Sequence, residues 1–79
     1  MIPRLELLLT EHCTLCDQAL DVLLGHPALT GARLQTVDVA FDDALLTRFG
    51  ERLPVLRCGD ATLFWPFDTA DVSRWLDRL

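Results

Sequence analysis

Cys13-Thr14-Leu15-Cys16 places two thiols one helical turn apart, where an apolar strand gives way to an amphipathic helix. Residues 4–10, with the sequence RLELLLT, are typical of a strand, and apolar residues recur after Cys16 at the spacing of one helix face. Cys13 is therefore expected at the helix N-terminus, where unpaired N–H groups and the positive end of the helix dipole favour a thiolate. Cys16 is in phase with the apolar face and should point inward. The pattern predicts an exposed attacking thiol and a shielded resolving thiol.

The cysteine spacing alone does not separate redox chemistry from metal binding, because C-x-x-C also forms half of many zinc sites. A second signal is the stretch Leu53-Pro54-Val55-Leu56, in which a proline opens a short apolar strand. At the first position of a strand a proline removes no hydrogen bond that the sheet needs. A C-x-x-C motif next to a strand–helix–strand pattern favours a thioredoxin-like redox function.

The length and composition of the chain predict one small folded domain over residues 1–79. A chain of this size buries roughly 60% of the surface of its unfolded form. Half of its residues (51%) are hydrophobic, which excludes disorder. The formal net charge is −5 and all seven cationic side chains are arginine. Because this charge repels a phosphate backbone or an anionic membrane surface, neither nucleic acid nor a membrane is an expected partner.

The expected location is the cytoplasm. The first residues lack the charged and apolar blocks of a signal peptide, and no apolar run approaches the roughly 20 residues of a membrane span. Three cysteines are an odd number for a fold held by disulfides, whereas a reducing compartment suits one reactive pair and one spare thiol. Cys58 is the expected spare thiol.

The first half of the chain predicts a strand, a helix and a second strand, at about residues 4–10, 14–24 and 33–39. Gly25 and Pro27 should end the helix, and Thr30-Gly31 should form a turn. Because the chain returns to the sheet through a helix, the two strands are expected to be parallel.

The second half predicts a short helix followed by a hairpin. The helix should begin at Asp42-Asp43, end before Gly50 and turn three apolar side chains inward, namely Leu45, Leu46 and Phe49. Strands at 54–57 and 62–65 are separated by a turn-rich connection short enough for an antiparallel hairpin.

The last helix has the clearest local signature. Asp68 with Asp71 three residues later is typical of a capping box, and Phe67 and Val72 occupy the positions of a hydrophobic staple. Its core-facing residues are expected to be Val72, Trp75, Leu76 and Leu79. The order βαβαββα predicts an α/β fold with a mixed four-stranded sheet flanked by helices.

Three segments of the chain carry a resemblance to a known family, namely HCTLCD at 12–17, LPVL at 53–56 and WPFD at 65–68. Together with the order βαβαββα, they resemble the glutaredoxin arrangement of the thioredoxin fold, in a compact bacterial glutaredoxin-like subfamily. The resemblance covers almost the whole chain. It implies a thiol-disulfide oxidoreductase that takes part in cell redox homeostasis, with Cys13 as the nucleophile and Cys16 as the resolving thiol. It also implies that Pro54 is cis and lies beside Cys13, and that the backbone of Leu53 binds a disulfide substrate.

The substrate-binding residues are expected to be His12, Thr14, Leu15, Leu53 and Pro54. We predict His12 to be an exposed loop residue rather than the base of a cysteine hydrolase, because adjacent residues entering a helix point apart. The expected substrate is a disulfide on another protein or on a small thiol, and the expected cofactor and metal content is none.

Three departures from well-characterised glutaredoxins bear on glutathione. Thr14-Leu15 stands in place of Pro-Tyr, Glu11-His12 in place of an upstream lysine, and Pro66-Phe67 in place of paired glycines. Glutathione has two carboxylates that need cations or N–H donors. Pro66 lacks an N–H and Asp68 adds a like charge, so glutathione should bind weakly as a co-substrate. The cations that would reverse this expectation are Arg48, Arg52 and Arg57.

Several further side chains are assigned structural roles. Asp17 should form a capping box with Thr14 rather than carry protons for Cys16. His26 is expected to be a helix-end residue without a chemical role. Six aromatic side chains are expected in the core, namely Phe41, Phe49, Phe64, Trp65, Phe67 and Trp75. The position of Trp65 near the end of a strand would also allow it to border the active site.

Two alternatives belong to other functional classes. The first is a metal or iron–sulfur site, for which the conceivable ligands are Cys13, Cys16, Cys58 and His12. Cys58, however, should lie roughly 13 Å from the active-site end of its strand, at about 3.3 Å per residue. A variant of the metal-site hypothesis is an iron–sulfur cluster that two chains share through Cys13. The other alternative is a non-catalytic binding module of the thioredoxin fold, with the edge at Leu53 as its docking strand.

Overall fold

The computed structural model describes residues 4–29 and 33–79, and within them a four-stranded mixed sheet of strand order β2-β1-β3-β4. The strands are β1 (Arg4–Leu9), β2 (Arg33–Asp38), β3 (Val55–Cys58) and β4 (Ala61–Phe64). β1 pairs in parallel with β2 and antiparallel with β3, and β3 pairs antiparallel with β4. The predicted topology and sheet are therefore confirmed.

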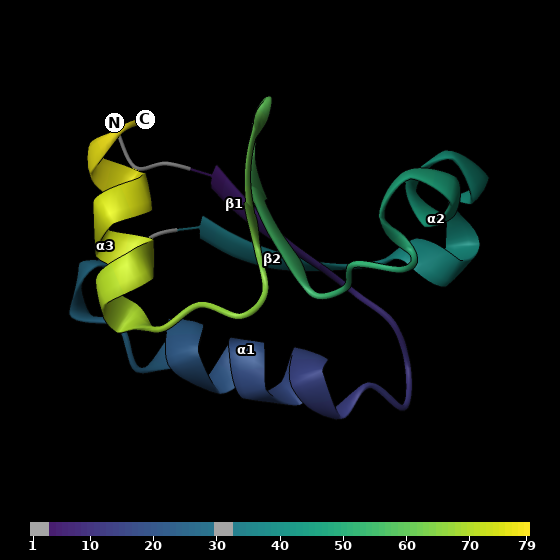
Figure 1. Ribbon diagram of the computed structural model, residues 1–79, viewed down its shortest axis with the longest axis horizontal. Helices are drawn as coiled ribbons and strands as arrows, with labels where there is room; N and C mark the ends of the chain where they lie inside the picture. The colour runs from purple at the N-terminus through teal and green to yellow at the C-terminus, as the bar shows by residue number, and fades with distance from the viewer. Residues whose placement is uncertain (1–3, 30–32) are drawn as a thin grey trace.

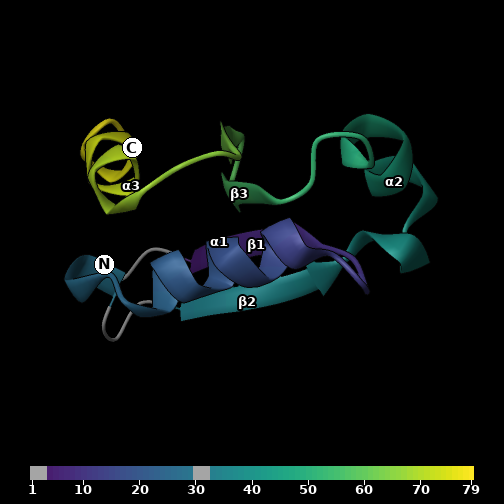
Figure 2. The same cartoon turned by 60° about the horizontal axis from the view of Figure 1, so that its bottom comes forward.

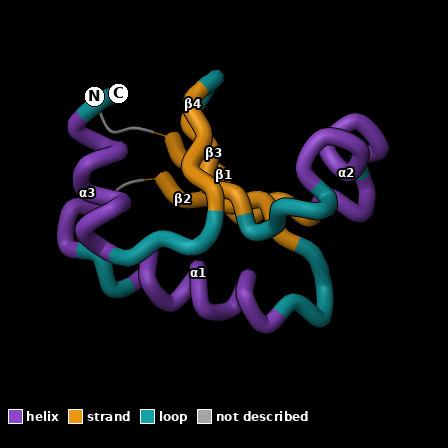
Figure 3. The backbone as a smooth tube through the Cα atoms, viewed as in Figure 1, coloured by secondary structure: helices purple, strands orange, loops and turns teal. Residues whose placement is uncertain are grey.

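Three α-helices and two short 3₁₀ helices connect the strands. They are α1 (Thr14–Leu24), η1 (Pro27–Leu29), η2 (Val39–Phe41), α2 (Asp43–Phe49) and α3 (Thr69–Asp77). Figure 1 and Figure 3 show the sheet between α3 and α2, with α1 below the sheet. Figure 2 shows α1 running along the parallel pair β1 and β2.

The sheet buries both faces, since successive side chains of a strand point to opposite sides. Leu5 and Leu7 of β1 join the larger core cluster, in which α1 and α3 cover the sheet. Leu8 points the other way and packs with Val39 and with Phe49 of α2. The apolar run in β1 is thus explained by a central strand that is covered on both faces.

The N-terminus of α3 carries the predicted capping box. The Asp68 carboxylate accepts the Asp71 N–H at 2.8 Å, and the Asp71 carboxylate accepts the Asp68 N–H at 3.0 Å. The bond from the Asp68 backbone and an ion pair with Arg74 hold the pKa of Asp71 below its ordinary value of 3.8. Phe67 and Val72 are both buried, as a hydrophobic staple requires.

Three predicted core residues are instead exposed. Leu46 has an exposed fraction of 45%, because Leu45 and Phe49, one turn apart on α2, already cover the sheet and Leu46 is rotated away from them. Leu79 is 53% exposed because α3 ends at Asp77 and the helical spacing stops there. Phe41 is 87% exposed, because it ends η2, in which Val39 is the residue that turns to the core. The predictions for these three side chains were wrong.

Element boundaries differ from prediction by one residue at several places. β2 ends at Asp38, whose carboxylate accepts the Ala40 N–H at 2.9 Å and starts η2, so that Val39 leaves the strand. The hairpin closes tightly between Cys58 and Ala61, with Gly59 at a φ of 60°. β3 and β4 therefore each begin one residue away from the expected position. The predicted turn at Thr30-Gly31 lies outside the described residues.

His26 follows the end of α1, as predicted, and it also contacts α3, which was not predicted. It is 5% exposed, and its Nε2 lies 2.8 Å from Ser73 Oγ, so that the end of α1 is linked to α3.

In the described part of the chain, no helix is long and apolar enough to cross a membrane.

Candidate active site

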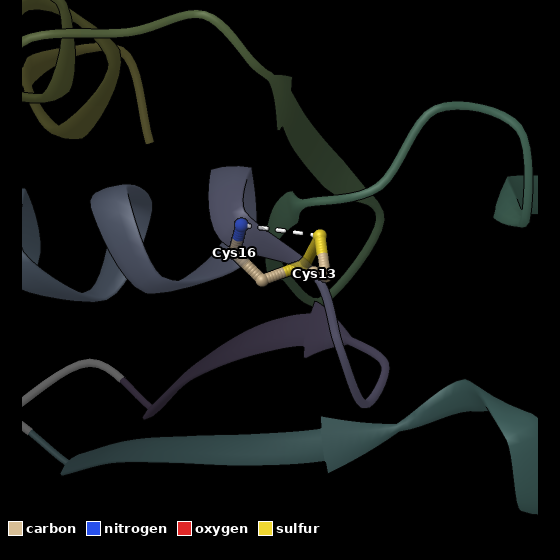
Figure 4. Close-up of a disulfide and its surroundings, with 2 residues drawn as sticks. All are labelled: Cys13 and Cys16. Carbon is tan, nitrogen blue, oxygen red and sulfur yellow. Dashed lines mark hydrogen bonds between the residues drawn. A yellow bond between two sulfur atoms is a disulfide. The ribbon is translucent and has the colours of Figure 1, made fainter.

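Cys13 and Cys16 form a disulfide at the N-terminus of α1, with their Cα atoms 5.2 Å apart (Figure 4). Cys13 is the N-cap residue of the helix, with extended backbone angles. Its Sγ accepts the Cys16 N–H at 3.2 Å, and its carbonyl accepts the Asp17 N–H at 3.2 Å. A sulfur atom thus occupies the place of a capping oxygen, among the first N–H groups of the helix.

The two sulfur-bearing residues differ in exposure. Cys16 is 2% exposed and packs on the core side of α1, whereas Cys13 is only partly buried. The predicted asymmetry is therefore present in the structure. An incoming disulfide can reach Cys13, and Cys16 is shielded behind it.

Thr14 does not cap the helix, and the predicted capping box with Asp17 is wrong. Because Cys13 is the N-cap, Thr14 is the first helical residue and Asp17 stands at the fourth position, one beyond the place that a capping box uses. Both side chains are exposed. Thr14 and Asp17 therefore lie on the open side of the helix start.

His12 adopts a left-handed backbone conformation, with a φ of 56°. Non-glycine residues rarely occupy this region, although histidine does so more often than most. Its position between the end of β1 and the N-cap turns the chain into α1, and its side chain is exposed as predicted. The short connection between strand and N-cap was the available signal for such a turn.

A groove of about 350 Å³ opens beside the motif. Its lining residues are Leu15, Glu51, Arg52, Leu53, Phe64 and Trp65. Leu15, which lies between the cysteines, is 46% exposed. The groove brings together Leu15 and Leu53, two predicted substrate-binding residues that are far apart in sequence, and Trp65 borders it.

Two proline segments adjoin the groove, since Leu53 and Trp65, which line it, each precede a proline. The Leu53–Pro54 peptide is cis, as the glutaredoxin resemblance implies, and Pro54 is buried. The Trp65–Pro66 peptide is also cis, which was not predicted. The Trp65 N–H donates to the Pro54 carbonyl at 3.3 Å, and the Trp65 ring meets the edge of Phe67 with centroids 5.0 Å apart. The two segments therefore lie side by side.

The three arginines named as possible glutathione contacts have different surroundings. Arg57 pairs with Glu6, directly opposite on β1, at 3.0 Å. The Arg48 guanidinium lies 4.9 Å from the centre of the Phe49 ring, away from the groove lining. Arg52 lies over the Phe64 ring at 5.2 Å and lines the groove. Of the three, Arg52 is thus the one that lines the groove.

Cys58 is a free, partly buried thiol at the hairpin end of β3, where it pairs with Ala61. It packs against the core cluster under α1 and α3. Among the described residues, no three His, Cys, Asp or Glu side chains are grouped as metal ligands would be. His12, Cys13, Cys16 and Cys58 therefore do not converge within one chain.

The fold and the helix-capping cysteine pair define a thioredoxin-fold domain of the glutaredoxin type. Residues 4–77 match the family described as glutaredoxin-like domain (DUF836), and the chain belongs to this family. It is similar to the X-ray structure of protein XcR50 from X. campestris, with 36% identity, a TM-score of 0.82 and coverage of 95% of this chain and 97% of that one. The solution structure of XcR50 gives 35% identity, a TM-score of 0.79 and coverage of 96% and 95%. The chain has no match among curated proteins.

Proposed function

We propose that this protein is a thiol-disulfide oxidoreductase in which Cys13 attacks a substrate disulfide and Cys16 resolves the product. The observation that supports this most directly is the Cys13–Cys16 pair at disulfide distance, with an accessible sulfur at the helix N-cap and a buried sulfur behind it. Membership of the glutaredoxin-like family supports the same chemistry.

The reaction transfers two electrons to the substrate. The reduced Cys13 thiolate attacks one substrate sulfur, the substrate S–S bond breaks, and the departing thiolate takes a proton. Cys16 then loses its proton and attacks Cys13 Sγ, which releases the second substrate thiol and leaves the Cys13–Cys16 disulfide. A thiol or dithiol reductant, small or protein-bound, must reduce that disulfide to complete the cycle.

The environment of Cys13 favours its role as nucleophile. Its sulfur accepts the Cys16 N–H at the N-terminus of α1, and a hydrogen bond to sulfur together with the helix dipole stabilises a thiolate. Glu11 and Asp17 carry exposed negative charges nearby in sequence and oppose this effect, whereas a protonated His12 would add to it.

We further propose that the substrate is a protein disulfide or a small disulfide other than that of glutathione, in the cytoplasm. The backbone of Leu53, next to buried Pro54 and on the groove wall, is the proposed edge for binding an extended substrate. His12 and Thr14 flank Cys13 in the sequence, and their exposed side chains would contact the substrate there.

The test is trapping of a mixed disulfide. The Cys16→Ser variant should accumulate an adduct through Cys13 when it meets a substrate disulfide, and Cys13→Ser should not. Cys58→Ser is the matched control, and it should turn over like the wild type. Trapping by Cys13→Ser alone would reverse the two roles. A second measurement is the reduction potential of the Cys13–Cys16 pair against a glutathione buffer. If the pair forms no reversible disulfide in that buffer, the proposed function is contradicted.

A further inference from the structure

We propose that the groove beside the disulfide selects polypeptide substrates that carry a large apolar residue and an acidic residue within two positions of the target cysteine. This inference rests on the proposed exchange activity and names the substrate class of the same site. An extended chain advances about 3.3 Å per residue, so positions one or two from the target cysteine reach a groove that starts at Leu15.

The apolar requirement comes from the groove wall. Four of its six lining residues are apolar, namely Leu15, Leu53, Phe64 and Trp65. Leu15 has almost half of its surface exposed between the two cysteines, whereas Cys16, Ala19 and Leu23 of the same helix are buried. A side chain that covers this wall removes apolar surface from water on both partners, which favours binding.

The acidic requirement comes from Arg52. Its guanidinium lies over the Phe64 ring at 5.2 Å, a stacked position that holds the group at the groove while its N–H donors stay available. Arg52 is exposed, and no carboxylate in the described part of the chain forms an ion pair with it. A substrate carboxylate is the group that this fork of N–H donors binds best.

Glutathione meets only part of these conditions. It has no large apolar side chain to cover the wall, and its two carboxylates find one cation at the groove. Glu51, also exposed and on the groove lining, repels the second carboxylate. A polypeptide supplies the apolar contact and a single negative charge, and therefore fits the groove better.

The test measures how fast the reduced full-length protein consumes peptides that carry one cysteine in mixed disulfide with 2-mercaptoethanol. Three peptides differ only in the flanking pair: Leu and Glu, Leu and Gln, or Ser and Glu. The preference for Glu over Gln should fall roughly twofold to fivefold in Arg52→Gln, the range of one exposed ion pair. Because the preference is compared between protein variants, the effect of Glu on the peptide's own thiol cancels.

Arg48→Gln is the matched control, since Arg48 stacks on Phe49 in the same way but does not line the groove. It should keep the wild-type preference for Glu. Arg52→Glu should reverse the charge preference, as measured with a fourth peptide that carries Leu and Lys. The preference for Leu over Ser should be roughly threefold to tenfold and should fall in Leu15→Ser, because a partly buried leucine gains part of the free energy of full burial.

The outcomes separate this inference from the proposed function. Unchanged preferences in Arg52→Gln and Leu15→Ser, in a protein that still exchanges with the peptides, would overturn the substrate class and leave the exchange activity standing. Faster consumption of glutathione disulfide than of all three peptides would also overturn it. A protein that exchanges with neither peptides nor dithiothreitol would refute both proposals.

Discussion

The Trp65 N–H donates to the Pro54 carbonyl at 3.3 Å, one step beyond the last Val55–Phe64 pair of the β3–β4 hairpin. This bond extends the hairpin ladder to the end that lies at the groove. Leu53, which precedes Pro54, and Trp65 are both groove walls, so the bond sets their relative position. Both residues lie outside the strands, and the bond ties them to the end of the sheet at which Phe64 completes β4.

Oxidised protein is expected to contain one free thiol. Cys13 and Cys16 form the disulfide, and Cys58 packs at the hairpin end with no disulfide partner. Alkylation without reduction should therefore label Cys58 alone, and mild reduction should add labels at Cys13 and Cys16, as read by mass spectrometry of peptides. An oxidised form with Cys58 paired and Cys13 free would contradict the site assignment.

Glutathione is expected to be a poor substrate. Two lost charge-assisted hydrogen bonds, at roughly 1.5–3 kcal/mol each, weaken binding by a factor on the order of 100 or more relative to an ordinary glutaredoxin. Steady-state deglutathionylation by the two proteins at the same glutathione concentrations checks this expectation. Equal turnover would mean that Arg52 rebuilds the carboxylate clamp, and Arg52→Gln would then remove the activity.

The fold was largely predictable because its signals are local and repeated. Each of three local signals constrains one secondary-structure element: the helix spacing after Cys16, the capping pair Asp68 and Asp71, and the helix between the two parallel strands. These constraints agree with one another, so together they define the topology. The partial burial of Cys13 and the full burial of Cys16 follow from the same periodicity, since Cys16 is in phase with buried Ala19.

The surroundings of the thiols were less predictable, because they depend on contacts between distant segments. Arg48, Arg52 and Arg57 are close in sequence, yet one lies on α2, one lines the groove and one pairs with Glu6. Helical spacing likewise identifies a face but not the point where a helix ends, which is why Leu79 was misassigned. The capping role of Cys13 was missed because sulfur is not among the usual capping atoms.

His12 should tolerate glycine and resist β-branched residues. At a φ of 56°, glycine has no Cβ to clash, whereas a β-branched side chain is strongly disfavoured. We expect His12→Gly to change the free energy of unfolding by less than about 1 kcal/mol and His12→Val to lower it by roughly 1–2 kcal/mol. Urea unfolding of the reduced proteins measures both, and equal losses in the two variants would show that the imidazole matters more than the backbone.

Removal of the α3 cap should destabilise the domain, because the helix covers one face of the sheet. Asp68→Ala loses the bond to the Asp71 N–H and should cost about 1 kcal/mol, whereas Asp68→Asn keeps an acceptor and should cost much less. Urea unfolding at neutral pH measures the difference. A loss in Asp68→Asn as large as that in Asp68→Ala would show that charge, and not the hydrogen bond, is what the helix terminus requires.

Asp71 should make part of this stability depend on pH. Its pKa in the folded protein is lowered, chiefly by the bond from the Asp68 N–H and also by Arg74, so the unfolded chain binds its proton more readily. The contribution of Asp71 to the free energy of unfolding is therefore complete at pH values above its ordinary pKa of 3.8. This contribution is lost as the pH falls below 3.8 and through the lower pKa of the folded protein. Asp71→Asn should be less stable than the wild type at pH 6, and the gap should narrow toward pH values of about 3 and below. Urea midpoints across this range measure the gap, and a gap that stays constant with pH would mean that Asp71 does not act through its charge.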